Sequence, residues 1–104
     1  MQFSAIKDFD WQPTATPGAE KYEVWRGGEN AYFVAFRVKA GTVFRPHAHP
    51  GWEHLTVLSG CWQVGGKELG PGDVAITAPD EKHEESAIED SVVMISIGNN
   101  DVPG

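Results

Sequence analysis

The chain has 104 residues, of which 40% are hydrophobic, and carries a formal net charge of −7 at pH 7. This length supports one compact domain, and the acidic balance argues against binding to nucleic acid or to anionic membranes. Cys61 is the single cysteine, which excludes an intrachain disulfide. Because the sequence has neither an apolar signal segment at its start nor a spanning stretch, we expect a cytoplasmic protein.

Short strands are predicted along most of the chain, because 12 glycines and 7 prolines interrupt it at short intervals. Residues 1–20 are predicted to be an irregular or edge-covering arm, and residues 21–98 a barrel, within one domain over 1–104. The expected strands are 21–27, 31–38, 41–48, 53–59, 61–66, 73–78, 83–88 and 91–97. Gly65 and Gly66 are typical of a tight hairpin turn. The pattern predicts an all-β fold, a small antiparallel sandwich or barrel.

Histidines cluster in residues 45–54, which hold three of the four in the chain. Side chains alternate along a strand, so His47 and His49 are expected to face one side, and a Pro-Gly turn brings Glu53 back beside them. His83 opens a later strand. Together these four residues form a mixed nitrogen and oxygen donor set, which suits one divalent transition metal ion: Zn, Fe, Mn, Ni or Cu.

The same alternation places the neighbouring side chains. If Glu53 faces inward, His54 faces the opposite side of its strand, whereas a register shifted by one would make His54 the ligand instead. Arg45 shares the parity of the histidine pair, so it is expected to point into the barrel mouth. There it would either clamp a substrate carboxylate or enolate oxygen, or pair with an acidic residue at the rim. Glu53 and Arg45 are therefore the catalytic candidates.

Further expectations concern the core and the acidic residues near His83. The predicted barrel-facing core residues are Val43, Leu55, Val57, Trp62 and Ile76. Glu84 and Glu85 are expected to be a solvated charge pair, or one of them a partner that orients an imidazole.

The run Gly41-x5-His47-x-His49-x3-Glu53-x6-Gly60 resembles the first signature motif of the cupin superfamily at every defined position. The segment 72–87 resembles the second motif in part, with His83 in register. Three positions depart from it, since Ala78, Asp80 and Ala87 stand where the motif has Pro, Gly and Asn. The resemblance covers about residues 22–97 and implies an antiparallel jelly-roll β-barrel, or double-stranded β-helix, that holds one metal ion.

Residues 49–60 also resemble the cupin domain of zinc-binding anti-sigma factors and of diketone dioxygenases. This resemblance implies a metal-binding cupin, an enzyme that acts on a small metal-chelating organic substrate as a dioxygenase does. Three alternatives stay open: a non-catalytic metal-dependent sensor or binding module, an isomerase that uses the metal as a Lewis acid, and a degenerate cupin without metal. Small cupins usually pair and residues 31–36 are largely apolar, so a homodimer is expected.

Overall fold

The computed structural model describes residues 1–98; residues 99–104, the end of the expected domain, lie outside the described residues. Within residues 1–98, strands form two antiparallel sheets, one of six strands and one of four, and the helical content is a single 3-10 turn, η1 (Ile6–Asp8). No helix in this part of the chain is long and apolar enough to cross a membrane. The predicted all-β class is confirmed.

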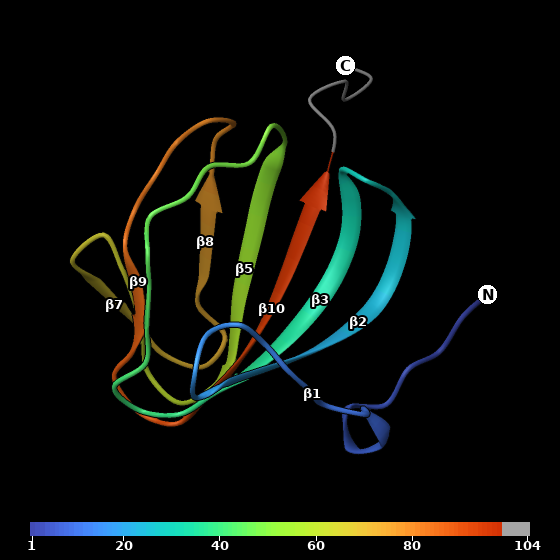
Figure 1. Ribbon diagram of the computed structural model, residues 1–104, viewed down its shortest axis with the longest axis horizontal. Helices are drawn as coiled ribbons and strands as arrows, with labels where there is room; N and C mark the ends of the chain where they lie inside the picture. The colour runs from blue at the N-terminus through green and yellow to red at the C-terminus, as the bar shows by residue number, and fades with distance from the viewer. Residues whose placement is uncertain (99–104) are drawn as a thin grey trace.

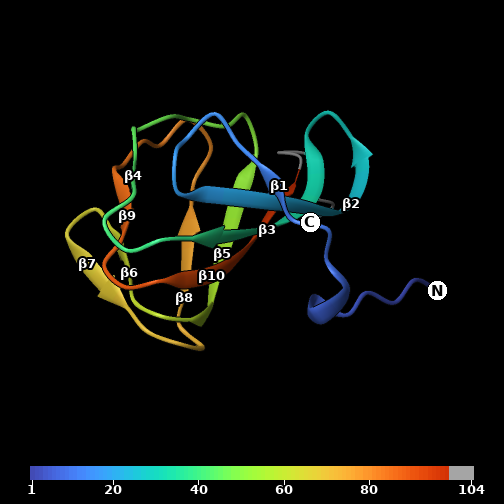
Figure 2. The same cartoon turned by 60° about the horizontal axis from the view of Figure 1, so that its bottom comes forward.

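The larger sheet contains β1 (Gln12–Pro13), β2 (Ala19–Gly28), β3 (Ala31–Val38), β5 (Trp52–Ser59), β8 (Val74–Thr77) and β10 (Ser91–Gly98). The smaller sheet contains β4 (Val43–Phe44), β6 (Trp62–Val64), β7 (Lys67–Leu69) and β9 (Glu85–Ala87). The spatial order is β1-β2-β3-β10-β5-β8 in the larger sheet (Figure 1) and β4-β9-β6-β7 in the smaller sheet (Figure 2). Figure 2 shows the smaller sheet at the left of the molecule and β2 extending to the right. Each expected strand overlaps an observed one, and the Gly65-Gly66 turn joins β6 to β7.

The core is built where β10 lies between β3 and β5. Ile95 is opposite Val34 on β3 and Leu55 on β5, so these side chains share the inner face of the larger sheet. The buried hydrophobic cluster comprises Ala19, Val38, Leu55, Val57, Trp62, Leu69, Ala87 and Val93. Burying such apolar side chains contributes roughly 1.5–3 kcal/mol for each large one.

Two predicted core residues are wrong. Leu55, Val57 and Trp62 are at most 2% exposed, as expected, but Val43 is 51% and Ile76 55% exposed. In the register between β8 and β5, Ala75 and Thr77 are paired with the inward-facing residues of β5. Ile76 is paired with His54 and therefore lies on the outer face of the sheet. Val43 belongs to a strand of only two residues, whose partly buried member is the next one along.

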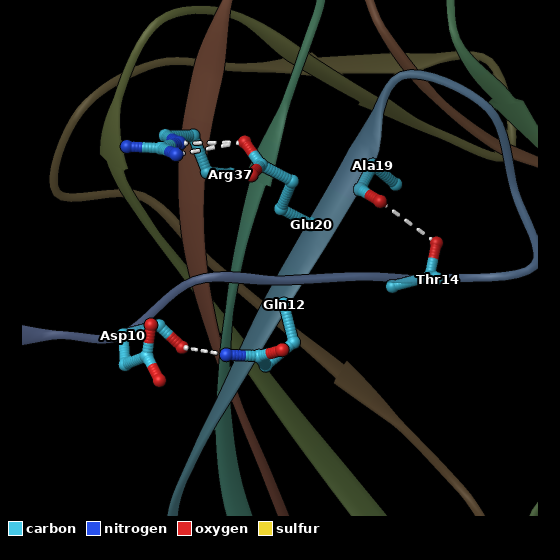
Figure 3. A network of polar contacts seen from close by, with 6 residues as sticks. All are labelled: Asp10, Gln12, Thr14, Ala19, Glu20 and Arg37. Carbon is cyan, nitrogen blue, oxygen red and sulfur yellow. Dashed lines mark hydrogen bonds and ion pairs between the residues drawn. The ribbon is translucent and has the colours of Figure 1, made fainter.

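The N-terminal arm lies along the outer edge of the larger sheet. Its strand β1 pairs with β2, and the hydroxyl of Thr14 donates to the carbonyl of Ala19 at 2.8 Å (Figure 3). Nearby, Arg37 on β3 donates two hydrogen bonds, of 3.0 and 2.8 Å, to Glu20 on β2. The ring of Phe9 stacks on Tyr22, with centroids 4.4 Å apart. These contacts fix the arm against one end of β2.

Candidate functional site

A cavity of about 100 Å³ receives side chains from both sheets and from the segment that connects β4 to β5. Its lining residues are Tyr32, Val34, Phe36, Phe44, His47, His49, Glu53, Trp62, Glu85, Val93, Ile95 and Ile97. Most of them are aliphatic or aromatic, and a few polar groups converge on this apolar enclosure. Ligand sites typically have this composition.

Glu53 enters the cavity from β5, where it is opposite Ile97 on one side and Thr77 on the other. It is 6% exposed. The pKa of Glu53 is raised from 4.5 to about 7: burial is the main cause, the nearby Glu85 also raises the pKa, and His47 partly offsets them. A buried carboxyl group beside a second one would be stabilised by a cation.

His47 and His49 reach the same cavity by a route that strand alternation does not explain. The expected strand 41–48 is reduced to the two residues of β4, and residues 45–49 form no strand. Pro46 and Pro50 lack the N–H that a ladder needs, which accounts for the interruption. The two imidazole rings nevertheless lie together, with centroids 4.8 Å apart and planes at 84°.

Both imidazoles can present a free nitrogen lone pair. The Nδ1 of His47 lies 3.0 Å from the carbonyl oxygen of Arg45, which can only accept, so Nδ1 is the donor and Nε2 is the ring nitrogen left to face a ligand. The Nε2 of His49 lies 3.5 Å from Oε1 of Glu53. Burial, with a smaller contribution from His47, lowers the pKa of His49 and favours its neutral form.

His83 lies beside the cavity and is not among its lining residues. Its Nε2 is 3.1 Å from Oγ1 of Thr77, a buried residue directly opposite Glu53 on the neighbouring strand. The structure therefore brings His47, His49 and Glu53 to one cavity. His83 contacts Thr77, and Thr77 is the residue paired with Glu53 across the two strands.

The turn before His83 accommodates one departure from the cupin motif. Asp80 has a φ of 63°, in the left-handed region that the motif's glycine would adopt freely. Aspartate tolerates this region better than most residues. The N–H of Asp80 donates to the carbonyl of His49 at 2.9 Å, so the turn is attached to the histidine segment.

Neither Arg45 nor His54 lines the cavity. Arg45 is exposed and lines a neighbouring surface hollow, which shares Phe44 and His47 with the cavity. Strand alternation does not carry Arg45 inward, because no strand runs through residues 45–49. Its role in substrate binding stays a prediction. His54 is exposed on the outer face of β5, in the orientation expected from the register.

Sequence reasoning missed two polar residues of the cavity. Glu85, which was expected to be solvated or to orient an imidazole, is 8% exposed and lines the cavity from β9. The small buried Ala87 two residues later was the available signal, because it shares the inner face of β9. Tyr32 also lines the cavity, and the guanidinium of Arg26 lies 4.6 Å from its ring centroid.

The donor chemistry fits a divalent cation. Two imidazoles and a buried carboxyl group provide the mixed nitrogen and oxygen set that such ions accept. In the present side-chain positions, no three His, Cys, Asp or Glu residues within 1–98 form a group that could hold a metal ion. The pair between His49 and Glu53 and the contact of His83 with Thr77 occupy donors that an ion would use.

Two antiparallel sheets around a cavity lined by histidine and glutamate are features of the cupin class. The chain belongs to the family described as the ChrR cupin-like domain, whose model matches residues 1–103. No curated protein matches the chain.

Solved structures share the fold. One is a chain of the Rhodobacter sphaeroides SigE complex with the anti-sigma ChrR: identity is 24%, the TM-score is 0.77, and the match covers 90% of this chain and 51% of that one. This chain thus spans about half the length of that relative. KdgF from Halomonas sp. is 25% identical, with a TM-score of 0.74 and 97% of both chains covered. A putative acetylacetone dioxygenase from Methylibium petroleiphilum PM1 is 17% identical, with a TM-score of 0.82 over 93% of this chain and 76% of that one.

Proposed function

We propose that the chain is a metal-binding cupin that acts on a small metal-chelating organic molecule by dioxygenase-like chemistry. The observation that carries this proposal is the gathering of His47, His49 and Glu53 on one largely apolar cavity. The structural likeness to the putative acetylacetone dioxygenase supports the choice of chemistry. In this proposal the two sheets form the jelly-roll barrel of the cupins.

The residues that would hold one divalent transition metal ion (Zn, Fe, Mn, Ni or Cu) are His47, His49, Glu53 and His83. When bound, the ion would supply Lewis acidity and, if it is redox-active, reactivity toward dioxygen. Glu53 is the proposed proton acceptor for a bound substrate, because its carboxyl group lines the cavity together with His47 and His49. The aliphatic side chains of Val93 and Ile95 exclude water from the reacting groups.

Elemental analysis of the purified protein, followed by oxygen-electrode assays, tests this proposal. Metal-free protein is reloaded with each candidate ion and offered diketones, flavonols and thiols. We expect about one ion per chain and oxygen consumption with one metal and substrate class. Protein that takes up none of the ions would refute the proposed site, and metal uptake without turnover would refute the enzymatic part.

A metal-dependent sensor is the second candidate, and the match of the ChrR cupin-like model over residues 1–103 favours it. In this case the metal and a small ligand would change the stability of the domain without any chemical conversion. Thermal unfolding of the metal-loaded protein with each compound separates the candidates. A ligand that raises the midpoint and is recovered unchanged indicates a sensor.

A further inference from the structure

Glu85 lines the cavity and can contact the substituents of a molecule bound there. It projects from β9 of the smaller sheet, whereas Glu53 projects from β5 of the larger one, and both line the same space. Glu85 is 8% exposed, so its carboxyl group is largely shielded from bulk water. The proposed metal-holding set does not include it.

The orientation of the Glu85 carboxyl is fixed by Trp62. The indole Nε1 donates to Oε1 of Glu85 at 3.1 Å, and Trp62 is itself 2% exposed, with its ring centroid 5.8 Å from that of Phe44. No side-chain hydrogen bond among the described residues engages Oε2 of Glu85. Because no fully buried polar side-chain atom in residues 1–98 lacks a partner, this oxygen is accessible. It is thus an acceptor without a partner, in the carboxyl group of a residue that lines the cavity.

The cavity wall around Glu85 is unsuited to anions. Two carboxyl groups line the cavity, and the lining that the structure describes includes no lysine or arginine. The guanidinium of Arg26, which lies over the Tyr32 ring, is already paired with Glu23 at 2.6 Å. A bound divalent ion would attract the chelating oxygens of every candidate molecule alike, whereas a further carboxylate on the molecule, brought beside Glu85, would meet repulsion that the apolar walls do not screen.

We infer that Glu85 is a specificity-determining residue, which selects uncharged chelating molecules that carry a hydroxyl donor and rejects those that carry a carboxylate. The inference rests on the proposed function, since it assigns the substrate class of the same cavity. A cavity of about 100 Å³ restricts the choice to compact molecules of one small ring or a short chain.

Three hydroxypyranones of one skeleton test this assignment by calorimetric titration into zinc-loaded protein. They share the same chelating oxygens and differ in one substituent: methyl in allomaltol, hydroxymethyl in kojic acid and carboxylate in comenic acid. In the wild-type protein we expect kojic acid to bind about threefold to tenfold more tightly than allomaltol, because its hydroxyl donates to Glu85. Comenic acid should bind at least tenfold more weakly than kojic acid.

The Glu85→Gln variant removes the charge and keeps the shape, and we expect it to narrow the gap between comenic acid and kojic acid to about threefold or less. Glu84→Gln is the matched control, because Glu84 is the exposed neighbour with the same charge. If comenic acid binds as well as kojic acid to the wild type, or if Glu85→Gln and Glu84→Gln behave alike, the inference is wrong. The three-compound comparison in the wild type needs no variant, so it decides even if Glu85→Gln fails to fold.

Metal content, measured on every sample, separates failure of this inference from failure of the proposed function. If the wild type takes up zinc and binds the three compounds with equal affinity, the metal site is supported and the proposed role of Glu85 is wrong. If the wild type takes up no metal, the proposed function falls, and the same compounds are titrated into metal-free protein by amide NMR. The preference for kojic acid over comenic acid should persist there, because Glu85 acts on the substituent, and its absence would overturn the inference.

Discussion

Glu53 and His54 are adjacent in the chain and have opposite environments. Glu53 is 6% exposed inside the cavity, whereas His54 is exposed on the outer face of β5 with Thr56 and Leu58. A shift of one residue in the register would exchange them. The choice between these two as ligands therefore depends on the pairing of β5 with its neighbours.

Alanine variants at His47, His49, Glu53 and His83 should each lose most of the bound metal, because each removes one of four proposed donors. His54→Ala is the control and should keep the wild-type stoichiometry, since its side chain lies on the other face of β5. Mass spectrometry of metal content across the five variants gives the answer. Metal loss in His54→Ala together with retention in Glu53→Ala would reverse the assignment.

Arg45→Ala should keep wild-type metal content, because the side chain lies outside the cavity and a guanidinium cannot bind a cation. A change in the affinity for a substrate, with the metal retained, would support the predicted role in substrate binding. Titration of the reloaded variant measures both quantities. Metal loss as severe as in His47→Ala would instead show that the Arg45 side chain supports the conformation of the histidine segment, because the backbone carbonyl of residue 45 that contacts His47 is kept in the variant.

The stability of the metal-free protein should depend on pH through Glu53. Its folded pKa of about 7 exceeds the ordinary value of 4.5, so the folded state holds the proton more tightly. Stability from this group is therefore present below pH 4.5 and is lost as the pH rises through 7. The Glu53→Gln variant has no ionisable group at this position and should not lose stability in this way. Between pH 4.5 and 7 its free energy of unfolding should therefore rise relative to that of the wild type by on the order of 3 kcal/mol.

Urea unfolding of both proteins at several pH values measures this difference. His49 has a pKa lowered from 6.5, so its contribution to the stability of the fold is lost in the opposite direction, as the pH falls below 6.5. Because both proteins contain His49, its contribution is common to the two unfolding curves. A difference between the two proteins that does not change with pH would contradict the burial of an ionisable Glu53.

At the scale of the elements, the sequence predicted the long strand β5 better than it predicted the segment 45–49, which connects β4 to β5. Alternation placed Glu53, Leu55 and Val57 inward on β5, because β5 is eight residues long and paired on both sides. It failed for Val43 and Arg45, because the strand stops at Phe44. A two-residue period holds only where a ladder continues, and Pro46 and Pro50 lack the N–H groups that would continue this one.

Gly60→Ala should destabilise the fold more than Gly66→Ala. Both glycines are left-handed, with φ of 88° and 87°, so each substitution costs about 1–2 kcal/mol of backbone strain. A Cβ at Gly60 would in addition clash with the carbonyl oxygen of Asp90 and with Ser91, whereas a Cβ at Gly66 would meet nothing within 4 Å. Urea unfolding should give a further loss of about 1–3 kcal/mol for Gly60→Ala. Equal losses would show that the junction before β6 relaxes freely.

At the scale of the whole molecule, turn punctuation and motif spacing were enough to predict an all-β fold of the cupin class. They were insufficient for the position of single side chains across sheets. Glu85 reaches the cavity because β9 pairs with β6, and Ile76 leaves the core because of the register of β8. Such pairings join residues far apart in the chain, so local patterns do not determine them.

A homodimer remains our prediction for the whole molecule. β3 lies between β2 and β10, so it offers no free edge for strand exchange. Leu58, Val74 and Ile76 are 44%, 52% and 55% exposed on the outer face of β5 and β8, which a second copy would cover. Equilibrium sedimentation should show a dimer at tens of micromolar, and Ile76→Lys should shift it toward monomer. Ile88→Lys, at another exposed isoleucine, is the control, and a monomeric wild type would contradict the prediction.

The histidine segment gives the site two parts of unequal stiffness. Glu53 stands on a strand held by neighbours on both sides, whereas His47 and His49 lie between two prolines, on a stretch attached to the turn before His83 by the bond from Asp80 to His49. Displacing that stretch breaks few backbone hydrogen bonds, whereas separating the sheets would break many. Local movement of this stretch would therefore open the cavity at a lower free-energy cost than separation of the sheets, and would leave the hydrophobic core assembled.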